Sequence, residues 1–380
     1  MDFELTDSMT MVRDAARQFA EKEIRPTVMK YDESQEFPHE IMKHLGDLGF
    51  LGVIVPETYG GAGLGYLEYI TIIEEISRVD PSVGLSIAAH NSLCTNHIYT
   101  FGNESQRKKY LPDLASGRKI GAWALTEPTS GSDAGAMLTT ARRDGDAYIL
   151  NGSKNFITHG SVGDVTVVMA KIDRAKDKKS ISAFIVENDS SGFIVSKKEN
   201  KLGMRCCDTS ALAFDNCRVP AENRLGEEGS GFSQALKILD GGRISIASLA
   251  LGIAQGALDA SIKYSKERKQ FGKPIAEFQA IQWKLSEMAT QLEAGRLLTY
   301  RAGHLKNSGK EIAMESAMAK YFASEAAVMV TNEAVQIHGG YGFIKDFPVE
   351  KFYRDVKLVT IGEGTSEIQK LVIARNLFEP

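Results

Sequence analysis

The spacing of apolar side chains changes twice along the chain. Over residues 6–117 apolar positions recur every three or four residues, with breaks at Pro26, Pro38, Pro56 and a glycine-rich stretch at 60–65. Between 119 and 220 the period shortens toward two, as in strands, most clearly over 147–150, 165–169, 181–186 and 210–214. The pattern therefore predicts a helical domain followed by an antiparallel β domain.

Beyond Gly231 the helical period returns over much longer stretches. Apolar residues at 244, 247, 251, 254, 258 and 262 mark one helix face, and the sequence from about 275 to 347 indicates further long helices. Long amphipathic helices pack as a bundle. We expect an α+β protein with an N-terminal helical domain (1–118), a middle β domain (119–225) and a C-terminal helical bundle domain (226–380).

Composition excludes several classes of partner. The chain has 380 residues, 43% of them hydrophobic and 25% charged, with a net charge of -4. No basic excess attracts nucleic acid or an anionic membrane. We find no long uncharged apolar run and therefore predict no membrane span. The first residues form neither a secretory nor an Arg-rich transit segment, which predicts a cytoplasmic protein of bacterial type.

The four cysteines do not indicate a metal site. Cys94, Cys206, Cys207 and Cys217 lack metal-ligand spacing, and the adjacent pair at 206 and 207 cannot easily bridge or chelate without strain. We expect free thiols in a reducing compartment.

Glu363 is the most informative carboxylate. It lies between Gly362 and Gly364, so no neighbouring side chain competes for the space around it, which favours a general base that meets a substrate. The alternative is a loop glutamate before a helix that is capped by Thr365 or Ser366, with Gln369 near its third position.

Other segments carry polar turns and cations. Residues 125–135 form a turn-rich, donor-rich loop, and Asn151-Gly152 predicts a hairpin turn before a strand that ends in Phe156-Ile157-Thr158. Arg268 opens a basic segment ending in Gly272, and residues 336–342 form a glycine-rich turn. The G-x-G-x-x-G fingerprint is absent, which argues against a Rossmann nicotinamide site.

In this order and at these separations, the segments closely resemble the acyl-CoA dehydrogenase family of flavoproteins, over essentially the whole chain. The resemblance implies the family's fold, in which the middle domain is β-barrel-like and the C-terminal domain is a four-helix bundle. It also implies noncovalent FAD, an acyl-CoA substrate, an electron-transfer flavoprotein as acceptor, and a homotetramer built as a dimer of dimers.

By this resemblance Glu363 removes the α-proton of an acyl-CoA while the β-hydrogen leaves as hydride to FAD, giving the 2-enoyl-CoA. A minority of relatives carry the base on a helix instead, at a position that is Gly242 here, so Glu363 is the one candidate. Burial beside an acyl chain should raise its pKa toward neutrality.

The remaining roles are also implied by the resemblance. Residues that match substrate contacts are Ser132, Asp240, Arg243 and Gly364. Residues that match FAD contacts are Trp123, Leu125, Thr126, Gly131, Ser132, Phe156, Ile157, Thr158, Arg268, Phe271, Gln279, Gln336, Ile337, Gly339, Gly340, Thr365 and Glu367. In relatives Arg268, Phe271, Gln279 and the turn at 336–340 reach the cofactor of a neighbouring subunit.

Each role has a simpler alternative. Phe156, where most relatives carry Trp, and Ile157 could be strand core. Arg268 could be an exposed helix end, and Arg243 part of a surface ion pair. His338 is interpreted as a structural turn residue.

Substrate and reaction have alternatives too. Gly362 replaces a residue that is often Tyr in relatives, which opens space for a branched or cyclic acyl group and favours a short-chain or branched-chain substrate. An acyl-CoA oxidase-like activity is disfavoured because the chain lacks a large C-terminal extension. A nucleic-acid-binding flavoprotein of the same superfamily is disfavoured by the acidic composition.

Overall fold

The computed structural model describes residues 4–173 and 178–378. The predictions drawn from the first three residues lie outside this part of the chain. The N-terminal region is helical, as predicted, and two of the predicted proline breaks fall at helix boundaries: Pro26 lies in a 3₁₀ turn, and Pro38 immediately precedes a helix. The helices are α1 (Asp7–Phe19), α2 (Val28–Ser34), α3 (His39–Asp47), α4 (Tyr66–Ser77), α5 (Pro81–Ala89), α6 (Asn96–Phe101) and α7 (Glu104–Ala115).

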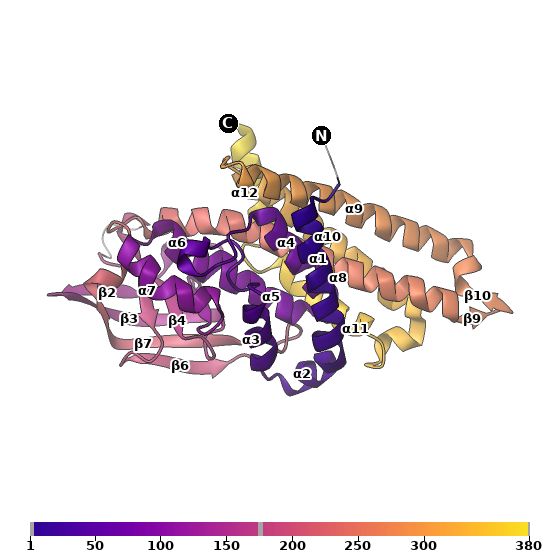
Figure 1. The fold of residues 1–380 in the computed structure, drawn as a ribbon, viewed down its shortest axis with the longest axis horizontal. Helices are drawn as coiled ribbons and strands as arrows, with labels where there is room; N and C mark the ends of the chain where they lie inside the picture. Colours follow the sequence, from indigo (N-terminus) through magenta and orange to yellow (C-terminus); the bar gives the residue numbers. More distant parts are fainter. Residues whose placement is uncertain (1–3, 174–177, 379–380) are drawn as a thin grey trace.

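The middle region is a sheet at one end of the molecule (Figure 1). Its strands are β1 (Gly121–Ala124), β2 (Thr140–Asp144), β3 (Ala147–Thr158), β4 (Val165–Lys171), β5 (Ile181–Glu187), β6 (Phe193–Lys198), β7 (Thr209–Pro220) and β8 (Arg224–Leu225). Their order is β6-β7-β3-β2-β4-β5-β8, and β1 pairs with β4. The four predicted strand segments lie in β3, β4, β5 and β7.

The sheet is mixed and not purely antiparallel as the sequence predicted. Strand β1 runs parallel to β4, and β2 meets β4 in parallel at a single pair. The antiparallel β2–β3 hairpin lies between β1 and β4 in the chain and lets those two strands run in the same direction.

The predicted Asn151-Gly152 hairpin turn is wrong. Both residues lie inside β3, at a shift of register against β7, and the turn between β2 and β3 is instead at Gly145 and Asp146. A side chain at Gly152 would approach Thr139 Oγ1 to 2.6 Å, and the backbone there has φ +147°. Glycine is thus required by close strand packing and not by a turn.

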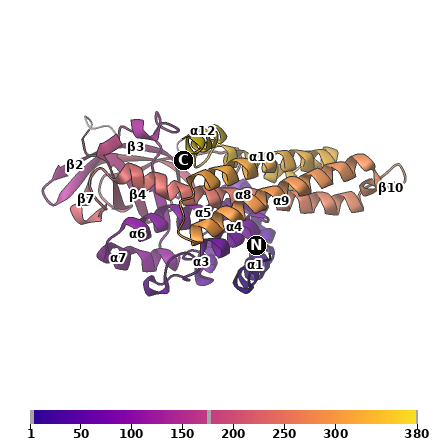
Figure 2. The same cartoon turned by 90° about the horizontal axis from the view of Figure 1, so that it is seen from above.

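The C-terminal region is built on three long helices, α8 (Gly231–Glu267), α9 (Gln279–Asn307) and α10 (Ala313–His338), with the shorter α11 (Val349–Asp355) and α12 (Ser366–Phe378). Figure 1 and Figure 2 show the three long helices extending away from the sheet toward a small hairpin, β9 (Lys269–Gln270) and β10 (Lys273–Pro274), at the other end. On the predicted apolar face of α8, Ile244, Ala247, Leu251, Ala254 and Leu258 are all buried.

One hydrophobic core joins the first and last regions. It combines residues of α1, α4 and α5 with the centre of α8 and with α10, so α8 packs between the N-terminal helices and the bundle. A buried charge cluster adds to this contact, since Lys351 donates to Asp80 at 2.9 Å and to Asp355 at 2.6 Å. The first and last regions therefore hold one another in place.

Within the described ranges no group of three or more His, Cys, Asp or Glu residues could hold a metal ion, and the four cysteines are free and buried.

By length and composition alone one described helix, α8, could cross a membrane, but 83% of its most apolar window is buried inside the fold. Such burial is typical of a core helix.

Candidate active site

Glu363 occupies a tight turn between α11 and α12. Its backbone is left-handed, with φ +53°, and Gly364 follows with φ +94°. A non-glycine residue in this conformation is uncommon and is found where surrounding contacts enforce it. Thr365 caps α12, because its Oγ1 accepts a hydrogen bond from Ile368 N–H at 3.3 Å. Thr365 is thus the N-cap of α12, and the Glu363 side chain is not needed to cap this helix.

The carboxylate of Glu363 points into the protein. Its Oε2 atom is buried and has no hydrogen-bond partner within the described chain. A methyl group at Gly242 would overlap this oxygen and would lie 3.3 Å from Leu93 Cδ2. The absence of a side chain on α8 at position 242 is therefore what makes room for the Glu363 carboxylate.

Burial dominates the electrostatics of Glu363. It raises the pKa of the carboxyl to about 7, while the nearby charges of Lys320 and Arg243 lower the pKa. A carboxylate with this pKa is suited to general base catalysis near neutral pH. The sequence prediction of a pKa near neutrality agrees with this environment.

Arg243 and Asp240 form an ion pair at 2.7 Å on the same helix. Arg243 is only 5% exposed, so the alternative of a surface pair is wrong. Its Nε atom is buried without a hydrogen-bond partner in the described chain, and burial lowers the pKa of Arg243 and raises that of Asp240. A buried, incompletely satisfied cation next to a candidate base is a site for a polar ligand group.

Sequence reasoning missed three residues that surround the base. Lys320 of α10 is fully buried, Tyr66 of α4 lies against Gly241, and Leu93 lies in a π-helical segment, His90–Thr95. Tyr66 and Leu93 come from the N-terminal helices and cannot be linked to Glu363 by sequence spacing. Lys320 did leave a signal, because it is the single charge in the apolar run from 317 to 323.

The first group of predicted flavin residues lies at the ends of β1 and β3. Trp123 is in β1, and Leu125, Thr126, Gly131 and Ser132 follow it in a loop. This loop is tied to β3, since Asn155 N–H donates to the Thr126 carbonyl at 2.8 Å and Lys154 donates to the Leu125 carbonyl at 2.9 Å. The structure thus brings the loop and the strand end together.

Trp123 connects this group to the base. Its ring packs with Leu93 and Ile238, and Leu93 also lies next to Gly242. The indole N–H donates to Nδ1 of His97 at 3.0 Å, and Nε2 of His97 is 2.9 Å from Gln234 Oε1. Burial lowers the pKa of His97 to about 4, so the imidazole is neutral and holds the indole as an acceptor.

Phe156 and Ile157 have different environments. Ile157 is 2% exposed and belongs to the core of the sheet, whereas Phe156 is 63% exposed with a left-handed backbone at φ +58°. The interpretation of Phe156 as strand core is therefore wrong. Its ring is available for stacking, while Gly131 and Ser132 are exposed and Thr158 is partly exposed at the end of β3.

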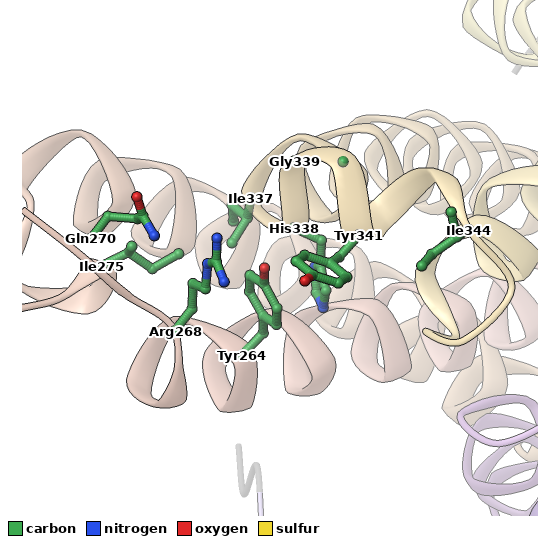
Figure 3. Close-up of a pocket in the computed structure, with 10 residues that line it drawn as sticks. Tyr264, Arg268, Gln270, Ile275, Ile337, His338, Gly339, Tyr341 and Ile344 are labelled. Carbon is green, nitrogen blue, oxygen red and sulfur yellow. The ribbon is translucent and has the colours of Figure 1, made fainter.

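The second group of predicted flavin residues gathers at the far end of the long helices. A cavity of about 560 Å³ is lined by Arg268, Gln270, Ile337, Gly339, Gly340 and Tyr341, among others (Figure 3). The Arg268 guanidinium lies 5.3 Å from the centre of the Tyr341 ring. We call this cavity the Arg268 pocket.

The Arg268 pocket fits the phosphate half of a dinucleotide. A Cβ at Gly339 or Gly340 would meet nothing within 4 Å, so a ligand can approach the main chain there, and Arg268 supplies a bidentate cation. Phe271, at the tip of the small hairpin, is 93% exposed. Gln279, which follows the hairpin, and Gln336, which precedes Gly339, are exposed as well. His338 is structural, since its ring stacks on Tyr264 with centroids 4.3 Å apart.

Two other predicted residues lie near the base. Gly364 follows Glu363 directly, and Glu367 is an exposed residue in the first turn of α12. The base and the Arg268 pocket, however, are not close. From Gly242 to Glu267 helix α8 spans about 38 Å at roughly 1.5 Å per residue.

Comparison with known proteins agrees with the fold and the site. The acyl-CoA dehydrogenase family models match in three parts: the N-terminal domain at residues 6–118, the middle domain at 122–217 and the C-terminal domain at 229–378. A short-chain specific acyl-CoA dehydrogenase of Clostridium acetobutylicum is 48% identical over 378 residues, covering 100% of both chains.

Two solved structures are also similar over 100% of both chains. Butyryl-CoA dehydrogenase from Megasphaera elsdenii matches with a TM-score of 0.98 and 44% identity. A chain from a structural study of the electron transferring flavoprotein of Acidaminococcus fermentans matches with a TM-score of 0.99 and 48% identity.

The fold and the buried carboxylate define an oxidoreductase that acts on CH–CH bonds with FAD as its cofactor. The chain belongs to the acyl-CoA dehydrogenase family.

Proposed function

We propose that this enzyme dehydrogenates a short-chain acyl-CoA to the 2-enoyl-CoA, with Glu363 as the base. The observation that carries the proposal is the buried, unpaired Glu363 carboxylate facing the bare backbone of Gly242. Support for a short substrate comes from the similarity to a short-chain specific relative and to butyryl-CoA dehydrogenase.

In the proposed reaction Glu363 accepts the α-proton, and its carboxylate faces the bare backbone of Gly242 on α8. The backbone N–H of Glu363 donates to the thioester oxygen and stabilises the enolate-like charge that develops as the proton leaves. Arg243 and Lys320 keep part of the carboxylate population ionised despite burial. Leu93, Trp123 and Ile238 supply an apolar wall that excludes water.

FAD, when bound, supplies the acceptor for the β-hydride. Leu125, Thr126, Ser132 and Thr158 would hold its ring, with Phe156 stacked against it. Arg268 and the backbone at 336–340 would hold the phosphates and adenosine half.

We propose further that the substrate site beside Glu363 accepts acyl groups that are branched or cyclic. A Cβ at Gly362 would lie 3.5 Å from Leu358, an ordinary contact, so the glycine leaves space that a larger side chain in relatives would fill. An acyl-CoA panel tests both proposals by anaerobic flavin bleaching. Short straight and branched substrates should bleach the flavin, and long-chain ones should not. Failure of every acyl-CoA to reduce the flavin would overturn the proposed function.

The proposed electron acceptor is an electron-transfer flavoprotein. The family and the similar chain from the flavoprotein study support this partner. Reoxidation of the substrate-reduced enzyme should be fast with this acceptor and slow with dissolved oxygen. Rapid reoxidation by oxygen alone would favour an oxidase instead.

We also propose a homotetramer, arranged as a dimer of dimers. About 38 Å of α8 separates Gly242, which faces the base, from Glu267, which precedes Arg268. This separation supports an arrangement in which the Arg268 pocket of one copy holds the FAD that lies beside Glu363 of another copy. Light scattering should give the mass of four chains, whereas a fully active, FAD-loaded monomer would contradict this arrangement.

A further inference from the structure

Lys320 is a buried ammonium in contact with the catalytic turn. It lies on α10 with no exposed surface, and its Nζ donates to the Gly364 carbonyl at 2.6 Å. It forms no salt bridge within 4 Å to any residue in the described ranges. A lysine buried without an ion-pair partner costs free energy, so its position requires a reason other than stability.

The Gly364 carbonyl is the fixed point of the left-handed turn. It accepts from Lys320 on one side and from Gln369 Nε2, at 2.8 Å, on the other. Helix α10 also holds the flanks of this turn, since Ser324 donates to the Val359 carbonyl and Ser366 donates to Glu325. The strained backbone of Glu363 is therefore fastened mainly from α10.

The charges around Lys320 come from several helices. Burial lowers the pKa of Lys320 to about 8, and Arg243 of α8 lowers it as well. The carboxylates of Glu363, of Glu325 on α10 and of Glu367 on α12 raise it. Facing Glu363 itself are Lys320, Arg243 and the neutral hydroxyl of Tyr66 from α4. Because Asp240 already pairs with Arg243, Lys320 is the cation without a carboxylate of its own.

We propose that Lys320 is a positioning residue for the base: its ammonium holds the Gly364 carbonyl, and its positive charge keeps the Glu363 carboxylate ionised near neutral pH. This inference rests on the proposed function of Glu363. It assigns a residue of α10, distant in sequence, to the control of proton abstraction.

The pH dependence of anaerobic flavin reduction tests the proposal in Lys320→Met, Lys320→Arg and the parent. Removal of the cation should move the acid limb of the rate profile upward by about one pH unit or more, as for loss of a nearby opposite charge. At a pH below the parental limb Lys320→Met should then be slower by roughly tenfold, and the deficit should shrink as pH rises. Lys320→Arg should keep the acid limb close to its parental position.

An acid limb at the parental pH in Lys320→Met would overturn the proposal, whether the rate is unchanged or is lowered equally at every pH. The second result would show a packing role only. FAD content and circular dichroism verify folding, and Lys320→Gln, which keeps a donor without the charge, replaces Lys320→Met if that variant does not fold. Lys320→Gln should show the same displaced limb.

Infrared titration separates this inference from the proposed function. The carboxyl band that Glu363→Gln removes reports the protonation of Glu363 without any substrate. In the Lys320→Met background this band should titrate at higher pH than in the parent. If no acyl-CoA reduces the flavin but the band still moves, the proposed reaction fails and the electrostatic link stands; an unmoved band overturns the link itself.

Discussion

The surroundings of Glu363 and the Arg268 pocket differ in their physical character. Around Glu363 the walls are buried, the backbone is strained, and the charges of Arg243 and Lys320 lie in a low-dielectric interior. Around Arg268 the surface is open and lined by aromatic rings and bare glycine backbone (Figure 3). Phe271, three residues further along the chain, is exposed.

The difference separates two kinds of task, proton abstraction and the recognition of phosphates. Proton abstraction needs a pKa set by burial and a fixed geometry, and α4, α8, α10 and the turn before α12 provide both within one subunit. Recognition of phosphates needs accessible donors, which the end of α8 and the end of α10 present outward. In the proposed dimer of dimers, the second region would contact a cofactor that is held largely by another copy.

Among variants that keep Glu363, the largest effect is expected from filling the space at Gly242. In Gly242→Ala the new methyl overlaps Glu363 Oε2, so the carboxylate must move, and flavin reduction should slow by about 10²-fold. FAD content should be unchanged. Gly295→Ala, which adds the same methyl to α9 against Leu251 and Phe322, is the control for folding. A parental rate in Gly242→Ala would show that Glu363 is not constrained as described.

A related double variant tests whether catalysis depends on where the carboxylate lies in space or on which residue of the chain carries it. Glu363→Gly combined with Gly242→Glu should recover part of the lost rate, because residue 242 faces the position of the Glu363 carboxylate. Stopped-flow bleaching measures the recovery. No recovery in a folded, FAD-loaded double variant would contradict the claim that residues 242 and 363 place a carboxylate at the same position.

The next effect concerns the Arg268 pocket alone. Arg268→Ala removes a charge-assisted phosphate contact and should weaken FAD binding by roughly 10- to 100-fold, with little change in the rate of flavin reduction at saturating FAD. Lys269→Ala removes an exposed neighbouring charge outside the pocket lining and is the matched control. Equal FAD affinity in both variants and the parent would show that Arg268 is a surface residue.

The smallest effect is on stability. Burial raises the pKa of Glu363 from 4.5 to about 7, so the folded state holds this proton more tightly than the unfolded chain. The resulting stabilisation is complete below pH 4.5 and is lost as pH rises through 7. Glu363→Gln should therefore be more stable than the parent at pH 8, by about 1 to 3 kcal/mol, and the difference should fade by pH 5. Denaturation midpoints across this pH range measure it, and a difference that does not vary with pH would argue against the raised pKa.

Much of the fold followed from apolar periodicity. The helix-strand-helix order and the buried face of α8 were predictable because they depend on local spacing. The parallel β1–β4 pair was not, since strand partners far apart in the chain leave no periodic signal. The prediction of a turn at Asn151-Gly152 is wrong because the same dipeptide suits both a turn and a strand irregularity, and the turn is at Gly145-Asp146. The domain boundaries after 118 and 225 and the cytoplasmic location stay predictions.

The site residues that stand in sequence motifs could be predicted. Those that reach the site only through tertiary packing could not. Glu363, Arg268 and the turn at 336–340 stand in segments rich in glycine, which the sequence displays directly. Tyr66, Leu93 and Lys320 reach the base from three separate helices, and only the tertiary structure brings them together. Phe156 became interpretable only through its backbone angle and exposure.

The most direct test of the central claim is anaerobic stopped-flow reduction of the flavin in Glu363→Gln. The amide keeps the shape of the side chain but cannot accept the α-proton, so a good acyl-CoA should still bind while bleaching slows by roughly 10²- to 10⁴-fold. With Gly242 at the alternative position, no other carboxylate is placed there to take over. Bleaching of Glu363→Gln at the parental rate would contradict the assignment of Glu363 as the base.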